Sequence, residues 1–337
     1  MNVLVPNAAV AGNGQITSKA LVQAGITGLG HRVPDRIVPN SELETLVDTS
    51  DEWIRDRTGI EERRIVAPGE TLAHLCEAAA RSALEDAKLS VLDIDLIIVA
   101  TCTPENLFPS TAAQVQNALG ARCGAFDLEA ACSGFVYALI CASQFIATGA
   151  MKNVLVIGGE VMSRYVDWTD RNTCVLFGDG AGAAVVSAVD NGFGLLGFDL
   201  GADGSGGELL RCAVLPNEVN NAKIYQSGRE VYKFAVEQMG ASAVRGLESC
   251  GLTGEDVDLL VPHQANIRII QSAAKRLKMP MDKVFVNLQK YGNTSSATIP
   301  IALSEATKSN RINSGDTVVL VGFGAGLTWA SAVLKWK

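Results

Sequence analysis

Apolar residues follow two distinct spacings along the chain. Continuous apolar runs at 96–100, 154–158 and 317–321 are short and predict buried β-strands. Apolar residues at helical spacing predict helices over 72–88 and 231–249. Because strands and helices alternate, the pattern predicts an α/β layered fold with largely buried sheets.

The longest run without a charged residue covers 130–151. Its length suits a membrane span of roughly 20 residues. However, the run follows a strand-like segment at 125–129 and contains small or polar residues: Ser133, Gly134, Ser143, Gln144 and Thr148. These features favour a helix buried on all sides inside a globular protein, and we expect no membrane insertion.

Two pairs of segments resemble each other in the same order along the chain. Residues 93–100 resemble 256–263, and the glycine cluster at 178–182 resembles the one at 322–326. Each glycine cluster follows an apolar run that we interpret as a strand, and the run before the first cluster is 174–177. Each cluster precedes a second run, which ends in Ser-Ala-Val. The order predicts two related halves with unequal insertions, not a short-period solenoid.

The string Gly178-x-Gly-x-x-Ala183 also fits a loose dinucleotide-binding fingerprint. Such a loop should open a helix, with an acidic ribose ligand about 20 residues further on. Here a second β-like run, 183–189, follows at once. The glycines therefore indicate tight turns and close approach of strands, not a nucleotide site.

Composition narrows the class of protein. Of 337 residues, 48% are hydrophobic and 19% charged, which excludes a disordered chain, and the length alone suggests two domains. The net charge of −8 argues against nucleic acid as the main partner. Eight cysteines without a C-x-x-C pair, beside only three histidines, argue against a zinc site and indicate a reducing compartment. Residues 1–19 lack a basic region followed by an apolar block, so no secretory signal is predicted.

One cysteine stands in a setting that favours reactivity. Cys132 follows the strand-like segment 125–129, has small neighbours and precedes the uncharged helix. At a helix N-terminus the backbone dipoles favour a thiolate, and free N–H groups can bind an oxyanion. An inert buried thiol is the alternative, and we prefer it for the other seven cysteines.

Two further residues are candidates for catalysis. His263 ends an apolar strand-like run, where an imidazole is well placed in an α/β protein, unlike His31 in a loop and His74 in a helix. Asn293 lies among small polar residues, and a turn-forming asparagine is its ordinary interpretation. A catalytic role for Asn293 depends on Cys132 and His263 lying nearby, which spacing alone does not show.

Six strings together resemble the type III β-ketoacyl-acyl-carrier-protein synthases. They are 51–60 (DEWIRDRTGI), 130–135 (AACSGF), 176–182 (LFGDGAG), 263–266 (HQAN), 292–295 (GNTS) and 322–329 (GFGAGLTW). The resemblance implies a homodimer with a thiolase fold of five α-β-α-β-α layers and two pseudo-repeated halves. We accordingly expect an N-terminal extension of unknown role at 1–23, a half at 24–190 that carries the nucleophile, and a half at 191–337 that carries the histidine and the asparagine.

The resemblance also implies a ping-pong reaction that starts fatty acid synthesis. Cys132 takes an acyl group from an acyl-CoA, expected to be acetyl-CoA, and the enolate of malonyl-acyl-carrier protein, formed by loss of CO2, attacks it. His263 and Asn293 match positions that stabilise the enolate oxygen as neutral hydrogen-bond donors. The acyl-transfer oxyanion would lie between the backbone N–H groups of Cys132 and Ala325, where relatives often carry glycine. No cofactor beyond the coenzyme A thioester substrate, and no metal, is implied.

Other residues match positions of the family that contact substrates. Those implied to bind coenzyme A are Trp53 and Arg171 (an adenine sandwich), Arg57 (a phosphate contact), and Gly228, Tyr232 and Asn266 (the tunnel). Phe108 matches a residue of the dimer partner that shapes the acyl tunnel. The docking positions for the acidic carrier protein are Lys233, Arg268 and Lys275, with a solvated charged face as the alternative. Arg229, where many relatives carry asparagine, departs from the pattern and could add to this patch.

Related enzymes with other chemistry fit the sequence less well. Chalcone-type synthases typically carry proline where Ala325 stands, and elongating ketosynthases carry a second histidine at the position of Asn293. Hydroxymethylglutaryl-CoA synthases and olefin-forming enzymes rely on a catalytic glutamate, and none of the strings at 176–182, 263–266, 292–295 and 322–329 contains or adjoins a glutamate. A condensing enzyme or acyltransferase of secondary metabolism, or a homologue that only binds acyl-CoA, stays open. We expect a cytoplasmic protein, or one of the plastid stroma in a plant or alga.

Overall fold

Five strands form the first of two large sheets, in the order β3-β9-β8-β6-β7. The computed structural model describes residues 8–10, 16–18, 21–212 and 222–337. The strands are β3 (Gln23–Arg32), β9 (Asp179–Val189), β8 (Asn153–Val161), β6 (Leu96–Ala100) and β7 (Gly124–Leu128). β3, β9 and β8 are antiparallel neighbours, whereas β8, β6 and β7 run parallel. The apolar runs at 96–100 and 154–158 lie in β6 and β8, so their prediction as buried strands is confirmed.

The second sheet repeats this arrangement with four strands, in the order β10-β15-β14-β13. They are β10 (Gly194–Ala202), β15 (Thr328–Lys335), β14 (Thr317–Gly324) and β13 (Leu259–Pro262). β10, β15 and β14 are antiparallel, and β14 and β13 are parallel. The directions therefore match those of β3, β9, β8 and β6, which confirms the two pseudo-repeated halves.

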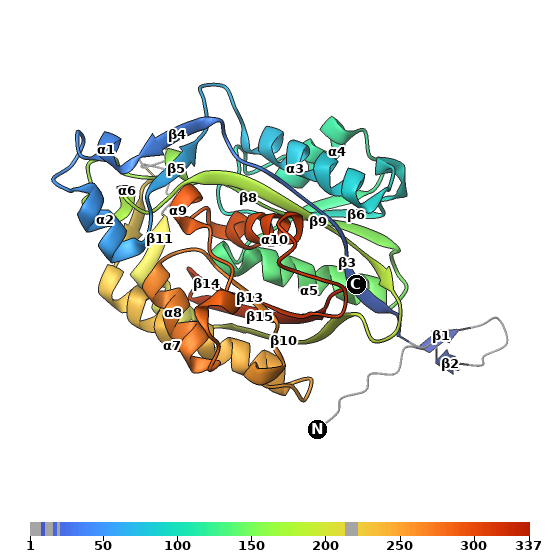
Figure 1. Cartoon of the computed structure of the whole chain (residues 1–337). Helices are drawn as coiled ribbons and strands as arrows, with labels where there is room; N and C mark the ends of the chain where they lie inside the picture. Colours follow the sequence, from blue (N-terminus) through green and yellow to red (C-terminus); the bar gives the residue numbers. More distant parts are fainter. Residues whose placement is uncertain (1–7, 11–15, 19–20, 213–221) are drawn as a thin grey trace.

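Helices separate and cover the sheets, giving five layers (Figure 1). Between the sheets lie α5 (Gly134–Ala147) and α10 (Thr298–Lys308). The first sheet is covered by α3 (Leu72–Ala87) and α4 (Thr111–Leu119), the second by α7 (Gly228–Glu248) and α8 (Ile267–Arg276). The uncharged run thus forms a helix in the middle layer, as predicted. Across the described ranges, no helix is both long enough and apolar enough to cross a membrane.

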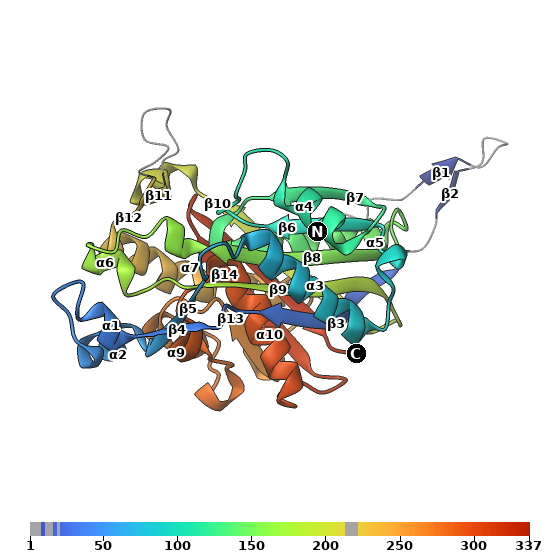
Figure 2. The same ribbon diagram turned by 90° about the horizontal axis from the view of Figure 1, so that it is seen from above.

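The shorter elements gather mostly at one end of the layers, and the β1–β2 ribbon projects from the other (Figures 1 and 2). The paired short strands are β1 (Ala8–Val10) with β2 (Ile16–Ser18), β4 (Arg36–Pro39) with β5 (Glu62–Ile65), and β11 (Leu210–Cys212) with β12 (Ile224–Gln226). The short helices are α1 (Asn40–Leu43), α2 (Asp51–Thr58), α6 (Arg171–Cys174) and α9 (Leu288–Tyr291). Most of the predicted N-terminal extension, 1–23, lies outside the described residues.

One of the two internal resemblances corresponds to equivalent structure. Residues 93–100 and 256–263 each lead from a 3₁₀ turn with a capping box into β6 or β13. The pairing of the glycine clusters is wrong, because 178–182 begins β9 whereas 322–326 ends β14 and turns toward β15. Residues 174–177 are no strand either: they end α6 and continue into a loop whose backbone bonds to Asn293.

Glycines of β8 and β9 let the middle layer approach the first sheet closely. Gly158 and Gly182 are opposite each other on these strands. A Cβ at Gly158 would lie 2.4 Å from the Ser296 carbonyl oxygen, and one at Gly182 would lie 2.7 Å from the Ile301 nitrogen. The glycines at 178–182 were expected to serve tight turns and close approach of strands, whereas Gly182 lies within β9 and lets α10 approach. The approach at Gly158 places the loop of residues 293–297 against β8.

Candidate active site

Cys132 lies at the turn between β7 and α5. The 3₁₀ turn η2 (Ala131–Ser133) leads directly into α5, and Ala131 takes a φ of 45°. A left-handed conformation is uncommon for alanine and often marks a functional site. A Cβ at Gly324 would lie 2.6 Å from the Cys132 nitrogen, so a glycine is needed where β14 passes the nucleophile. Ala325 follows immediately and lines the same cavity as Cys132.

The Cys132 thiol is buried. Burial raises its pKa to about 12, and a hydrogen bond with Ser295 offsets only part of this effect. The backbone dipoles at the N-terminus of α5 act in the opposite direction, and the expectation that they favour a thiolate stays a prediction. The thiol must lose its proton during the reaction.

His263 follows β13 and is almost completely buried, with 1% of its surface exposed. Its backbone N–H donates to the Val321 carbonyl (2.8 Å), and its ring meets the edge of Phe323. The ring Nδ1 lies 2.7 Å from the hydroxyl oxygen of Thr298, the first residue of α10. Burial lowers the pKa of His263 to about 3, so the imidazole is neutral at physiological pH.

Asn293 lies on the loop between α9 and α10. Its backbone N–H donates to the Leu176 carbonyl (2.8 Å), and its own carbonyl accepts from Gly178 (3.1 Å). The side-chain Oδ1 accepts a hydrogen bond from the Ser295 backbone N–H (2.8 Å). This bond fixes the orientation of the amide and leaves its NH2 group for the cavity.

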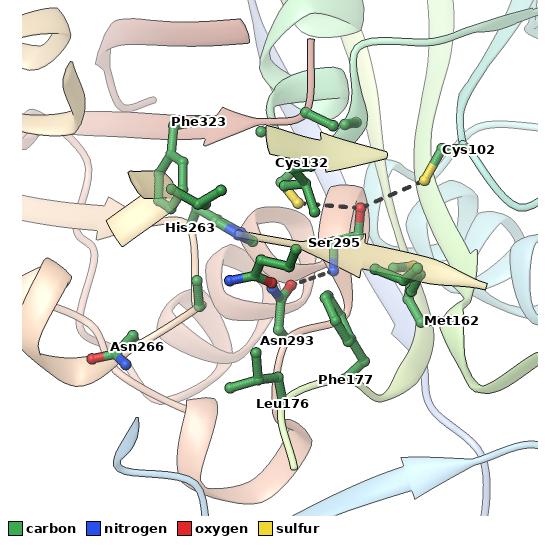
Figure 3. A pocket seen from close by; sticks show the side chains of 18 of the residues that line it. Cys102, Cys132, Met162, Leu176, Phe177, His263, Asn266, Asn293, Ser295 and Phe323 are labelled. Atoms are coloured by element: carbon green, nitrogen blue, oxygen red, sulfur yellow. Dashed lines mark hydrogen bonds between the residues drawn. The ribbon is translucent and has the colours of Figure 1, made fainter. Parts of the chain in front are cut away.

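One cavity of about 180 Å³ brings the three predicted catalytic residues together. Cys132, His263 and Asn293 all line it, from three separate parts of the chain (Figure 3). Ala325, Gly228, Tyr232 and Asn266 line it as well, as the resemblance implied. The arrangement presents a nucleophile opposite two neutral polar groups, which suits chemistry on a thioester carbonyl.

Sequence reasoning missed a polar group behind this cavity. Glu160, near the end of β8, is fully buried, and its Oε1 accepts a hydrogen bond from the Ser295 hydroxyl (3.2 Å). The same hydroxyl lies 3.4 Å from the Cys132 sulfur and 3.9 Å from the Cys102 sulfur. A carboxylate in an otherwise apolar strand, 157–161, was the available signal. Glu160 thus lies near the motifs in space although it is distant from them in sequence. Ser295 separates it from the nucleophile.

The residues expected to bind coenzyme A lie in two groups. Arg171 stacks over Trp53, with the guanidinium carbon 4.9 Å from the ring centroid. Asn266 caps α8 and donates from Nδ2 to the Arg57 carbonyl (2.9 Å), which ties α2 to the second half. The structure therefore brings Trp53 to Arg171 and Arg57 to Asn266. Since Arg171 and Trp53 already touch, a base inserted between them requires them to separate.

Phe108, expected to shape the acyl tunnel of a dimer partner, and the expected docking residues are on the surface. Phe108 is 86% exposed and lies beside the equally exposed Leu107. Lys233 on α7 and Lys275 on α8 are exposed. Arg268 is also exposed but pairs with Asp56 (3.0 Å), so its charge is partly neutralised. Phe108 does not line its own chain's cavity.

Comparison with known proteins identifies the family of the chain. The family model for 3-oxoacyl-[acyl-carrier-protein] synthase III matches residues 126–204, and the one for its C-terminal part matches 247–336. The β-ketoacyl-[acyl-carrier-protein] synthase III of Caldanaerobacter subterraneus subsp. tengcongensis is 54% identical over 326 residues, 94% of this chain and 98% of the relative.

Solved structures agree with the sequence comparison. The 3-oxoacyl-[acyl-carrier-protein] synthase III of Aquifex aeolicus VF5 matches with a TM-score of 0.89 at 49% identity, covering 93% of this chain and 100% of the other. The priming β-ketosynthase of the R1128 polyketide pathway matches with a TM-score of 0.89 at 37% identity, covering 94% and 98%.

The fold, the cavity and these relatives define a thiolase-fold condensing enzyme. Within that class the chain belongs to the β-ketoacyl-[acyl-carrier-protein] synthase III family. It is therefore an acyltransferase of fatty acid biosynthesis.

Proposed function

We propose that the enzyme joins an acyl-CoA primer, acetyl-CoA above all, to malonyl-acyl-carrier protein, with Cys132 as the acyl carrier. In the first half-reaction the Cys132 sulfur attacks the thioester and releases coenzyme A. In the second, malonyl-acyl-carrier protein loses CO2, and its enolate carbon attacks the acyl-cysteine to give the β-ketoacyl product. The observation that carries the proposal is the meeting of Cys132, His263 and Asn293 in one cavity. No cofactor beyond the thioesters takes part.

His263 and Asn293 stabilise the enolate oxygen in this proposal. Asn293 supplies its free NH2 group, and neutral His263 supplies Nε2–H. Nε2 carries the proton only if Nδ1 accepts one, and the Thr298 hydroxyl 2.7 Å away can donate it. That hydroxyl also donates to the Ser295 carbonyl (2.9 Å), an oxygen that accepts from the Thr298 backbone N–H as well. The proposal requires the hydroxyl to turn its single proton from this carbonyl to Nδ1, because a hydroxyl bonded to the carbonyl would instead accept from Nδ1–H.

Backbone groups stabilise the oxyanion of acyl transfer. The Cys132 N–H belongs to the first turn before α5, where N–H groups lack intrahelical acceptors. Ala325 lines the same cavity in the turn after β14, directly after Gly324, which packs against the Cys132 nitrogen. These two N–H groups can bind the oxygen of a tetrahedral intermediate on the Cys132 sulfur.

The cavity mouth supports entry of a coenzyme A thioester. Gly228 and Tyr232 belong to the first turn of α7 and line the cavity together with Asn266. The stacked pair of Trp53 and Arg171 can open to hold the adenine, with Arg57 contacting a phosphate. A cavity of about 180 Å³ suits a short acyl primer.

We also infer a homodimer in which Phe108 reaches the partner's acyl tunnel. β7 is an edge strand, and Phe126 on it is 39% exposed. Phe108 and Leu107 add a large apolar surface on the loop after β6. Exposed apolar side chains beside an unpaired strand edge favour association.

A basic surface for the acidic carrier protein fits the packing of α7 against α8. Lys233 lies on α7, and Arg268 and Lys275 lie on α8, all exposed. We propose a cytoplasmic location, or the stroma in a plastid-bearing organism. All eight cysteines are free thiols, which supports a reducing compartment.

The test offers the enzyme a ladder of acyl-CoAs and then malonyl-acyl-carrier protein, with the products identified by mass. We expect a β-ketoacyl-carrier protein with the shortest primers favoured. Preference for long or unusual primers would support a role in secondary metabolism. Acylation without any carbon–carbon bond formation would contradict the proposal.

A further inference from the structure

Glu160 is a buried carboxyl group that the reaction described above does not use. Its side chain is fully buried, and none of the salt bridges among the described residues involves it. Instead it has hydroxyl, amide and thiol partners: Thr101 Oγ1 (3.1 Å), Thr103 Oγ1 (2.6 Å), Cys102 N (3.2 Å), Cys102 Sγ (3.4 Å), Ser295 Oγ (3.2 Å) and Ser296 Oγ (2.9 Å). So many donors can stabilise a carboxylate without a cation.

One of these donors connects Glu160 to the nucleophile. The Ser295 hydroxyl lies 3.4 Å from the Cys132 sulfur (Figure 3). It also lies 3.2 Å from Glu160 Oε1, so it lies between a proton donor and a proton acceptor. Ser295 itself is held by its backbone N–H, which donates to Asn293, and has a φ of 50°. The serine is therefore fixed in place independently of its hydroxyl.

The buried thiol needs an internal proton acceptor. Its pKa of about 12 makes loss of the proton to solvent unfavourable at neutral pH. His263 has a pKa of about 3 and is a weak base. Burial raises the pKa of Glu160, which makes this carboxylate the better acceptor. Moving the proton from sulfur to Glu160 keeps the total charge of the buried site unchanged, so no additional charge has to be buried.

We propose that Glu160, acting through the Ser295 hydroxyl, holds the proton of Cys132 during acyl transfer. Cys132 gives its proton to Ser295 Oγ, and Ser295 gives its own proton to Glu160 Oε1. The thiolate forms the S–C bond with the acyl carbon, and the C–S bond to coenzyme A breaks. Glu160 then returns its proton through Ser295 Oγ to the leaving coenzyme A thiolate, which departs as the thiol, and Glu160 is a carboxylate again. This role rests on the proposed function, and Glu160 is a positioning residue that never touches substrate.

The other titratable groups around Glu160 do not compete as proton acceptors. Desolvation raises the pKa values of the Cys76 and Cys102 thiols well above the usual range, so both stay protonated. Glu129 accepts the Ala131 backbone N–H (3.0 Å) and, like Glu160, raises the pKa of Cys132. Glu105 and Asp127 act on Cys76 in the same direction. Of these groups only Cys102 also contacts the Ser295 hydroxyl (3.9 Å), and as a protonated thiol it does not accept the proton of Cys132.

Two neighbouring serines provide a matched pair of variants. Ser295→Ala removes the hydroxyl between Cys132 and Glu160 but keeps the backbone N–H that orients Asn293. Ser296→Ala removes a donor to the same oxygen, Glu160 Oε1, but its hydroxyl otherwise contacts the Ala100 carbonyl. A purely structural role of the Glu160 network predicts similar effects of the two changes, whereas proton transfer predicts an effect of Ser295→Ala alone.

The measurement follows acetylation of Cys132 by acetyl-CoA, alkylation of Cys132 by iodoacetamide and decarboxylation of malonyl-acyl-carrier protein from pH 6 to 9. We expect Ser295→Ala to slow acetylation and alkylation about 100-fold at pH 7, the range of a lost acid–base group. The acetylation and alkylation rates of Ser295→Ala should rise about tenfold per pH unit, because only direct ionisation of the Cys132 thiol remains. The corresponding rates of the wild type should change little. Decarboxylation and all rates of Ser296→Ala should stay near the wild type.

Glu160→Gln supplies a test of sign. If Glu160 accepts the proton, this variant slows alkylation at pH 7. If Glu160 acts only as a nearby negative charge, its removal lowers the pKa of Cys132 and alkylation becomes faster, which would overturn the proposal. Equal damage by Ser295→Ala and Ser296→Ala, or no effect of Ser295→Ala, would overturn it too. If Glu160→Gln does not fold, the serine pair still decides. Alkylation needs no thioester, so failure of the proposed function would not hide the result.

Discussion

Replacing Asn293 by alanine should separate the two half-reactions. The change removes the amide NH2 that faces the cavity, and loss of one such donor should slow malonyl decarboxylation roughly 100- to 1000-fold. It also removes the acceptor of the buried Ser295 N–H, a bond of 2.8 Å. An unsatisfied buried amide costs about 1–3 kcal/mol, so the free energy of unfolding should fall by that amount. Acetylation of Cys132 should persist, because the Ser295 hydroxyl keeps its contacts with Cys132 and Glu160 when the amide is removed.

Asn293→Asp is the matched comparison. Aspartate keeps an oxygen for the Ser295 N–H and therefore keeps most of the stability, but it puts a negative charge where the enolate oxygen forms. Denaturant unfolding, acetylation by intact mass and release of CO2 should be measured for both variants. We expect both to lose decarboxylation and only the alanine variant to lose stability. If Asn293→Ala decarboxylates normally but cannot be acetylated, the assigned roles are wrong and an acyltransferase explains the site better.

Two further predictions concern the surface and the pH response. Arg268→Glu should raise the KM for malonyl-acyl-carrier protein several-fold in steady-state assays and leave acetylation by acetyl-CoA nearly intact. Arg122→Glu, on the first half, serves as the control. Equal damage to both half-reactions would indicate a folding defect. The pKa of His263 is about 3 in the folded protein and about 6.5 when unfolded, so the unfolded state binds more protons between these values. The free energy of unfolding should therefore fall as the pH decreases below about 6.5, by up to roughly 1.4 kcal/mol per pH unit. His263→Asn should reduce this dependence on pH, as measured by urea titrations. An unchanged slope would contradict a buried neutral imidazole.

Much of the layered fold was predictable from local pattern. Runs such as 96–100 are apolar throughout because sheets covered on both faces bury every side chain. The resemblance of the glycine clusters misled because 178–182 and 322–326 share the pattern Gly-x-Gly-Ala-Gly but lie at opposite ends of their strands. Glycine permits close approach at either end of a strand, so composition alone cannot assign equivalence.

The candidate site was predictable only in part. Cys132 has a local signature, a strand-to-helix turn among small residues, and the structure shows that turn. His263 and Asn293 join it only through the folding of both halves. Glu160 stands 135 residues from Ser295 in the chain, and their contact depends on the close approach that Gly158 allows. Burial, which sets the pKa of Cys132, likewise belongs to the assembled layers and not to the motif.

Whether Cys132 carries the acyl group can be measured directly. The enzyme is treated with acetyl-CoA, its intact mass is recorded, and malonyl-acyl-carrier protein is then added. We predict one acetyl adduct per chain, absent in Cys132→Ser, that disappears as CO2 and the β-ketoacyl-carrier protein form. An adduct that persists in Cys132→Ser, or that malonyl-acyl-carrier protein does not discharge, would contradict the assignment of Cys132 as the acyl carrier.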